Sequence, residues 1–291
     1  MSRVGTGMTI TDGITRSIDV PGARLHYEVR GGIEFAARRG GPLLFVVGSP
    51  MGTADFAPFA DALASDRTVV TYDPRGLAGS TIEDPTQDAT PDLRADDVAA
   101  ILDALGVESA DVFGTSGGAV TGLALVHRHP GRVRTLIAHE PPVLELLPDA
   151  EVHRAGTEAI IATFHRDGPH AAFVHFMTTA GYDMSDPKLG PPPGPEPSPA
   201  ELAKRMSDMA RFFTHELRDT TRYVPDVAAL LASSTTVLVG IGVDSGHLIT
   251  HRTSTALCEL LGSSPVDFPG DHGGFIAAPG AFADRIREVL A

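Results

Sequence analysis

Short apolar runs alternate along the chain with stretches in which apolar residues recur every three or four positions. The runs have the length and composition of strands buried on both faces, and they lie at 42–47, 68–72, 110–113, 133–138, 235–240 and 265–268. Helical spacing lies between or after them, at 56–64, 93–105, 117–127, 254–261 and 281–291. Repeated strand–helix units with apolar strands predict an α/β fold, with a mostly parallel, doubly wound sheet covered by helices on both faces.

Two local signals sharpen this pattern near its beginning. The segments Ile14–Val20 and Ala23–Arg30 flank Pro21-Gly22, and together they predict a hairpin. Thr90 precedes Pro91, which predicts a helix that starts there with a hydroxyl cap and a proline in the first helical position.

The alternation stops between about residues 142 and 225. This stretch predicts helices only, at 150–164, 171–179 and 200–217, with seven prolines in the segment 186–199. We therefore expect an α/β core formed by residues 1–142 and 226–291, and a helical cap at 143–225 inserted before the last strands. The alternative is one long crossover connection, but most such connections need far fewer residues.

Composition and charge exclude several classes of protein. The chain of 291 residues is 42% hydrophobic and 21% charged, which is enough apolar material for a sizeable core. A formal charge of −14 repels phosphate backbones, so we expect no nucleic-acid partner. No apolar run reaches the length of a membrane span. The expected partner is a small-molecule substrate, and a homodimer stays an open alternative.

The single cysteine, Cys258, excludes an intrachain disulfide and a Cys-rich metal site. The first residues hold no apolar core of a signal peptide, so we expect a cytoplasmic protein. The basic residues are nearly all arginine, which together with abundant Ala, Gly and Pro is typical of a high-GC bacterial genome.

The strongest chemical signal is Gly114-Thr115-Ser116-Gly117-Gly118, a G-x-S-x-G between a predicted strand and a predicted helix. An abrupt strand-to-helix turn needs small neighbours and presents the apex hydroxyl at the helix N-terminus, where backbone N–H groups favour an anion. The alternative is a glycine-rich turn in which Ser116 merely caps the helix. We expect Ser116 to be a nucleophile.

These motifs together resemble the α/β-hydrolase superfamily, and the resemblance covers nearly the whole chain. Gly48-Ser49-Pro50-Met51-Gly52 stands where the family carries its oxyanion loop, and Tyr72–Ser80 resembles its D-x-R-G-x-G-x-S segment. Gly114–Gly118 matches the nucleophile elbow. The segments 237–244 and 268–275 stand where the family places its acid and its histidine. By the same resemblance, Asp73 and Arg75 are structural residues that brace loops beside the site.

A serine nucleophile needs a base and an acid that orients the base. His272 lies in a glycine-rich loop after the last strand and is the expected base. Asp244 follows the strand before it and is the expected acid, which gives the chain order Ser116, Asp244, His272. Glu140, at the end of an earlier strand, is the alternative acid.

Further site residues are candidates by resemblance or by composition. The resemblance implies that the oxyanion hole is formed by the backbone N–H groups of Ser49 and Gly117. Met51 either lines the pocket or packs in the core. The Met- and Phe-rich insertion suits an apolar substrate. The expected substrate contacts are Met51, Phe176, Met177, Phe213 and Phe275, and His175 and His215 are further alternatives in the insertion.

The sequence thus predicts a serine hydrolase that cleaves a carboxylic ester or lactone through an acyl-enzyme. The same residues support C–C bond hydrolysis, perhydrolysis or a cyclisation, and a non-catalytic ligand-binding module is a further alternative. Residues 240–246 faintly resemble a dinucleotide fingerprint, but Ser245 occupies its third glycine position and too little chain follows. We therefore expect no cofactor and no metal site.

Overall fold

One mixed sheet organises the computed structural model, which is described here over residues 13–31, 43–186 and 198–291. Within these residues the sheet has nine strands in the order β1-β2-β4-β3-β6-β7-β8-β9, with β5 paired to β2. The strands are β1 Ile14–Val20, β2 Ala23–Arg30, β3 Leu44–Val47, β4 Val69–Tyr72, β5 Thr81–Ile82, β6 Ala110–Thr115, β7 Val133–His139, β8 Thr236–Gly242 and β9 Val266–Phe268.

The sheet is parallel from β4 to β9 and antiparallel at its β1–β2 edge. The hairpin of β1 and β2 pairs Val20 with Ala23 across the predicted turn. Both the hairpin and the mostly parallel, doubly wound sheet are confirmed. Because parallel strands end at a common edge, the loops after β3, β6, β7, β8 and β9 lie side by side at their carboxyl ends.

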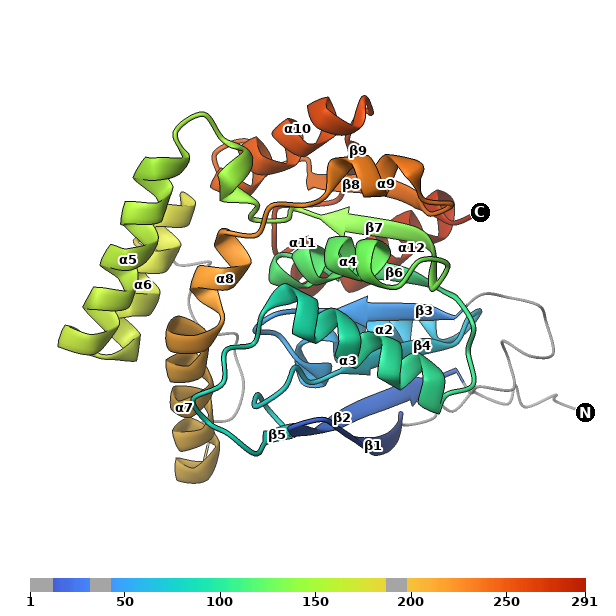
Figure 1. Ribbon diagram of the computed structural model, residues 1–291, viewed down its shortest axis with the longest axis horizontal. Coiled ribbons are helices and arrows are strands. Elements are labelled where there is room, and N and C mark those ends of the chain that lie inside the picture. The colour runs from blue at the N-terminus through green and yellow to red at the C-terminus, as the bar shows by residue number, and fades with distance from the viewer. Residues whose placement is uncertain (1–12, 32–42, 187–197) are drawn as a thin grey trace, which may run out of the picture.

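Helices cover both faces of the sheet (Figure 1). One face carries α3 and α4 with parts of α9 and α10, and the other carries α2, α11 and α12. Their bounds are α2 Thr53–Leu63, α3 Pro91–Ala104, α4 Gly117–Arg128, α9 Val227–Ala232, α10 Ile249–Leu261, α11 Gly274–Ala277 and α12 Pro279–Val289. The α3 helix begins as predicted, because the Thr90 hydroxyl accepts a hydrogen bond from the backbone N–H of Leu93.

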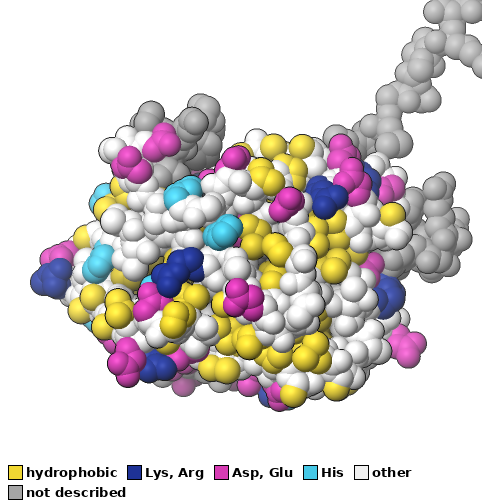
Figure 2. Space-filling model, turned by 90° about the horizontal axis from the view of Figure 1, so that it is seen from above, with side chains coloured by type: hydrophobic (Ala, Val, Ile, Leu, Met, Phe, Trp, Pro, Cys, Tyr) yellow, Lys and Arg dark blue, Asp and Glu magenta, His cyan; other side chains and the backbone are white. Residues whose placement is uncertain are grey.

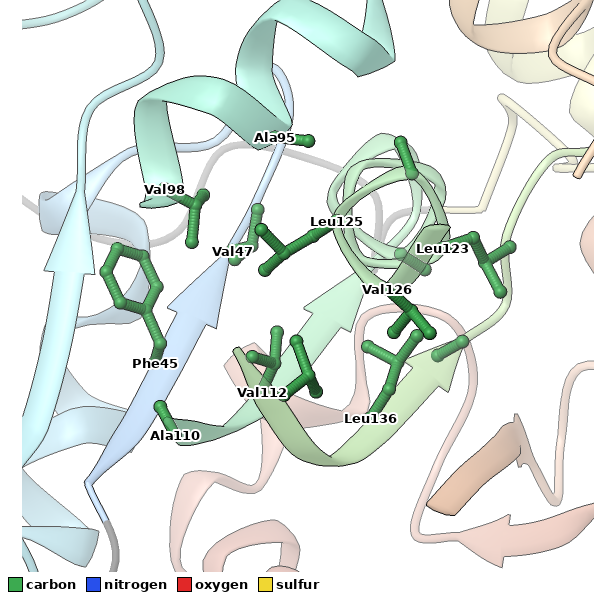
Figure 3. Close-up of a cluster of buried hydrophobic side chains, with 14 of the residues drawn as sticks. Phe45, Val47, Ala95, Val98, Ala110, Val112, Leu123, Leu125, Val126 and Leu136 are labelled. Carbon is green, nitrogen blue, oxygen red and sulfur yellow. The ribbon is translucent and has the colours of Figure 1, made fainter. Parts of the chain in front are cut away.

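Two apolar clusters fill the layers on either side of the sheet. In one of them, Val98 of α3 and Leu125 of α4 pack on Phe45 and Val112 (Figure 3). The other is rich in phenylalanine, with Phe56, Phe59, Phe113, Phe275 and Phe282 in mutual ring contact. Burial of these side chains fixes the strands, and therefore the positions of the loops at their carboxyl ends.

A group of helices lies beyond the carboxyl ends of the parallel strands (Figure 1). This α5–α8 segment consists of a 3-10 turn at Leu144–Leu146 and the helices α5 Ala150–Asp167, α6 Pro169–Ala180, α7 Pro199–His215 and α8 Leu217–Thr221. Its own apolar cluster joins α5, α6 and α7. The expected helix at 200–217 is instead two helices that meet at Glu216, whose φ of −131° departs from helical geometry. Residues 187–197 of the proline-rich segment lie outside the described residues.

Charge is dispersed over the face seen in Figure 2, where Lys and Arg side chains stand singly among Asp and Glu. In the described parts of the chain, no helix combines the length and the apolar character that crossing a membrane requires.

Candidate active site

The turn between β6 and α4 is the sharp element that the sequence predicts. Ser116 has φ 55° and ψ −127°, a conformation that costs a non-glycine residue about 1–3 kcal/mol. Its backbone N–H donates to the carbonyl of His139 at 3.0 Å. No described residue of α4 donates a capping hydrogen bond to the Ser116 hydroxyl. The Ser116 hydroxyl therefore does not serve as a helix cap.

Glycines make this turn possible. A Cβ on Gly118 would lie 2.0 Å from the carbonyl oxygen of Val47, and one on Gly114 would lie 2.5 Å from that of Gly118. No side chain fits at such distances to backbone atoms. The elbow is thus wedged against β3, which brings Ser116 next to the loop that follows β3.

Glu140 is the buried carboxylate of the site. It directly follows β7, has φ 49° and is 0% exposed. One oxygen accepts the N–H of Gly242 at 2.9 Å, and the other accepts the Thr250 hydroxyl at 2.7 Å. The second oxygen also contacts Nδ1 of His272 at 2.7 Å. Three donors therefore fix this carboxylate in one orientation.

The contact with His272 also explains the acidity of Glu140. Burial alone would raise the pKa of this carboxyl, but the hydrogen bond from His272 and the electrostatic interaction with its ring lower the pKa to about 2. Glu140 is thus a carboxylate at neutral pH. A carboxylate on Nδ1 holds the imidazole in the tautomer that leaves Nε2 free to accept a proton.

The expected pairing of Asp244 with His272 is wrong, and the alternative residue Glu140 makes this contact. Asp244 meets the histidine loop through its backbone, with its N–H on the carbonyl of Gly270 at 2.9 Å, while its side chain is exposed. The β8 strand extends two residues beyond the predicted end, and Asp244 lies in the turn that follows it, with its side chain in solvent. The chain then turns through Gly242 and Ser245.

A second histidine lies beneath the first. The His139 ring stacks on that of His272 with 6.1 Å between centroids, and its Nδ1 is 3.0 Å from the Thr115 hydroxyl. Burial lowers the pKa of His139 to about 3, so this ring is neutral at physiological pH. Because the Ser116 N–H also bonds to residue 139, the strand end at His139-Glu140 links the elbow to the histidine loop.

Ser49 and Gly117, the expected oxyanion donors, face each other. A Cβ on Gly117 would lie 3.0 Å from both the Cβ and the carbonyl oxygen of Ser49. Ser49 is 2% exposed and follows β3, and Gly117 is the first residue of α4. The structure therefore brings together five of the predicted or alternative residues: Ser49, Ser116, Gly117, Glu140 and His272.

Comparisons with known proteins identify the family of this fold. Residues 41–182 match the family model for the alpha/beta hydrolase fold. The uncharacterized hydrolase YraK of Bacillus subtilis is 32% identical over 97% of both chains. The chain belongs to the α/β-hydrolase family.

Further relatives of this α/β hydrolase carry more specific names. RutD of Caulobacter sp., a candidate carbamate hydrolase, is 28% identical over 92% of this chain and 96% of its own. The enol-lactonase of Burkholderia xenovorans superposes with a TM-score of 0.67 at 21% identity, over 94% of this chain and 99% of its own. The relatives show a hydrolase of α/β fold, and the structural neighbour shows the same fold.

The expected substrate contacts of this α/β hydrolase divide into two groups. Phe275 is 2% exposed and stacks on Phe56 at 5.2 Å, so it packs in the core rather than facing a pocket. Phe213 is also buried, against Phe164 and Phe176 of the α5–α8 segment.

The other expected contacts are less enclosed. Met51, Phe176 and Met177 are only partly buried, and they remain candidates for substrate contact. His175 and His215 bond to Thr163 and Asp88 instead.

Two buried ion pairs, Arg75 with Asp97 and Arg94 with Glu216, lie near the site. Asp73 and Arg75 are structural, as the resemblance implies. Asp73 accepts hydrogen bonds from Thr53 and Gly79, and Arg75 donates to Asp97 at 2.8 Å.

The second pair, Arg94 with Glu216, contacts Ser49 and was missed by sequence reasoning. The sequence feature that indicates this pair is Arg94, a charged residue on the apolar face of the helix predicted at 93–105. Within residues 13–31, 43–186 and 198–291, no three His, Cys, Asp or Glu side chains are grouped closely enough to hold a metal ion.

Proposed function

We propose that this protein is a serine hydrolase that cleaves a carboxylic ester or lactone of a moderately apolar small molecule through an acyl-enzyme. Ser116 is the nucleophile, His272 the base and Glu140 the acid. The observation that carries the proposal is the 2.7 Å contact of Glu140 with His272 beside a strained serine whose hydroxyl is not used as a helix cap.

Acylation follows from these positions. Ser116 Oγ attacks the carbonyl carbon as its proton passes to Nε2 of His272, and Glu140 stabilises the resulting imidazolium. The developing oxyanion accepts hydrogen bonds from the backbone N–H groups of Ser49 and Gly117. Collapse of the tetrahedral intermediate breaks the bond to the alcohol oxygen, which takes the proton from His272.

Deacylation repeats the same steps with water. His272 removes a proton from water, the hydroxide attacks the acyl carbon, and Ser116 leaves with the proton returned by His272. In a lactone the acid and the alcohol are two ends of one molecule, so a single hydroxy acid is released. The apolar, partly buried side chains of Met51, Phe176 and Met177 support an apolar acyl or ring group in the substrate.

The proposal is tested with a fluorophosphonate probe, which reacts with an activated serine. The wild type should be labelled, and Ser116→Ala should lose the label and hydrolysis of p-nitrophenyl acetate together. Ser65→Ala alters an exposed serine in the turn between α2 and β4, before the amino end of that strand; it is the matched control and should retain both. Labelling that survives in Ser116→Ala would refute the proposal.

Substrate preference is then measured with p-nitrophenyl esters of two, four and eight carbons, a δ-lactone and a p-nitrophenyl carbamate. The carbamate is included because of the similarity to RutD. We expect kcat/KM to be higher for the esters and the lactone, because a carbamate carbonyl is the weaker electrophile. A preference for the carbamate would overturn the substrate class and leave the nucleophile assignment intact.

A further inference from the structure

A buried polar network lies behind the loop that carries Ser49. It is built on Arg94 of α3 and Glu216 at the α7–α8 joint, whose side chains are both 0% exposed and approach to 3.2 Å. The Ser49 hydroxyl donates to Glu216 Oε2 at 2.8 Å and accepts from an Arg94 nitrogen at 3.0 Å. Both members of the ion pair therefore hold the side chain of one expected oxyanion donor.

The same guanidinium reaches the second expected donor through α4. Arg94 Nε donates to the Thr121 hydroxyl at 3.1 Å, and that hydroxyl donates to the carbonyl of Gly117 at 3.1 Å. Gly117 is thus held from behind, one hydrogen bond removed from Arg94. A single planar group braces the two backbone segments that face the oxyanion.

A third contact of Arg94 leads to the α5–α8 segment. Its remaining nitrogen donates to the Thr220 hydroxyl on α8 at 2.8 Å, beside Glu216. Arginine presents its donors in a rigid, planar fork, so the directions of these contacts are fixed relative to one another. A displacement of α8 would therefore pull on Ser49.

Stability alone does not account for such a pair. The desolvation of two buried charges is repaid only in part by their attraction, and well-packed apolar side chains often serve the fold as well. What a fully bonded guanidinium supplies is a defined geometry. Here that geometry is imposed on Ser49 and Gly117, where an error of a few tenths of an ångström weakens hydrogen bonds to the oxyanion.

We propose that Arg94, together with Glu216, is a positioning residue that holds the N–H groups of Ser49 and Gly117 in oxyanion-binding geometry and makes this geometry depend on the seating of α8. This inference rests on the proposed function, because it assigns a support for the oxyanion hole of that same reaction.

The test is Arg94→Lys, which keeps the charge but has a single donor centre in place of the fork. Loss of one oxyanion donor costs about 10²–10³ in kcat, and a misplaced donor should cost less, so we expect a roughly 10–100-fold fall in kcat. KM should change less than about threefold, since ground-state binding does not use the network. Binding of a trifluoromethyl ketone, whose adduct carries an oxyanion, should weaken by the same factor as kcat.

Arg75→Lys is the matched control. Arg75 is as buried as Arg94 and bonds to Asp97, but its side-chain contacts are not with Ser49 or Gly117. Both variants should lower the melting temperature. In Arg75→Lys kcat and ketone binding should stay within about threefold of the wild type.

Ser49→Ala is a milder variant for the case that Arg94→Lys does not fold. It retains the backbone N–H and the Arg94–Glu216 pair but removes the hydroxyl through which they hold the loop. We expect a fall of about tenfold in kcat with equal weakening of ketone binding.

Two results would overturn the inference. One is a wild-type kcat in Arg94→Lys or, if that variant is unfolded, in Ser49→Ala. The other is an equal loss in Arg75→Lys at an equal loss of melting temperature. These differ from failure of the proposed function, in which Ser116 of the wild type takes no fluorophosphonate label.

Discussion

The identity of the acid can be decided by replacing Glu140 with glutamine. The change keeps the shape of the side chain and removes its charge from beside His272 at 2.7 Å. The pKa of Glu140 falls from 4.5 to about 2, and at about 1.4 kcal/mol per unit this corresponds to roughly 3 kcal/mol of preferential interaction with the charged carboxylate. Most of it comes from His272, so the imidazolium loses a comparable stabilisation.

An energy of this size corresponds to a loss of kcat on the order of 100-fold for Glu140→Gln. The glutamine amide also favours the wrong tautomer of His272, and a triad in which the acid is replaced by its amide can lose about 10⁴. We therefore expect a decrease between these limits, with KM little changed. The assay is burst kinetics with p-nitrophenyl acetate, together with the rate of fluorophosphonate labelling.

Asp244→Asn is the matched control because it makes the same chemical change on the residue that the sequence favoured. Its side chain is exposed, so kcat should stay within about twofold of the wild type. A Glu140→Gln enzyme with more than a tenth of wild-type kcat would refute the reasoning. So would a loss in Asp244→Asn as large as that in Glu140→Gln.

Three further predictions concern stability. The pKa of His139 is about 3 in the folded protein and 6.5 in the unfolded chain, so the unfolded chain binds more protons between these two pH values. Lowering the pH from 7.5 to 5 should therefore reduce the free energy of unfolding by about 2 kcal/mol through this residue. Urea unfolding at both pH values checks this, and His139→Asn should show a pH dependence smaller by that amount; an unchanged dependence contradicts it. Gly118→Ala should destabilise the fold by about 3 kcal/mol or more, because the new Cβ would lie 2.0 Å from the carbonyl oxygen of Val47. In Gly156→Ala, within α5, the new Cβ meets only an ordinary contact at 3.9 Å, so this variant should stabilise the fold by up to about 1 kcal/mol. The melting temperatures of the two variants must therefore move in opposite directions. Thr90→Ala removes the cap of α3 and should lower the unfolding free energy by about 1 kcal/mol in the same assay, and no change would show that the cap is dispensable.

The fold was predictable because buried strands and helices show a regular spacing of apolar residues in the sequence. The apolar runs predict the parallel strands to within two residues or so, and the pattern from 142 to 225 predicts helices without strands. The single helix predicted at 200–217 is wrong, because the helix breaks at Glu216, whose side chain turns inward to Arg94. The partners are 122 residues apart, so no local pattern records the contact.

Of the candidate site, only the parts that depend on local glycine-containing motifs were predictable. The elbow around Ser116 and the loop of His272 have local glycine signals, and both lie at the same sheet edge. The choice between Asp244 and Glu140 depends on which side chain turns inward after its strand. That direction is set by the φ of 49° at Glu140 and by the donors Gly242 and Thr250 from other elements, and none of these is visible in the sequence.

The two non-glycine residues with positive φ at neighbouring strand ends, Ser116 and Glu140, have a consequence for how this enzyme can change. Each conformation is held against its own preference by the packed sheet, at about 1–3 kcal/mol per residue. Glycine at either position would relieve the strain and abolish the proposed chemistry. Thermostability and turnover therefore oppose each other at these two positions, and selection for heat resistance alone would tend to erode the site first.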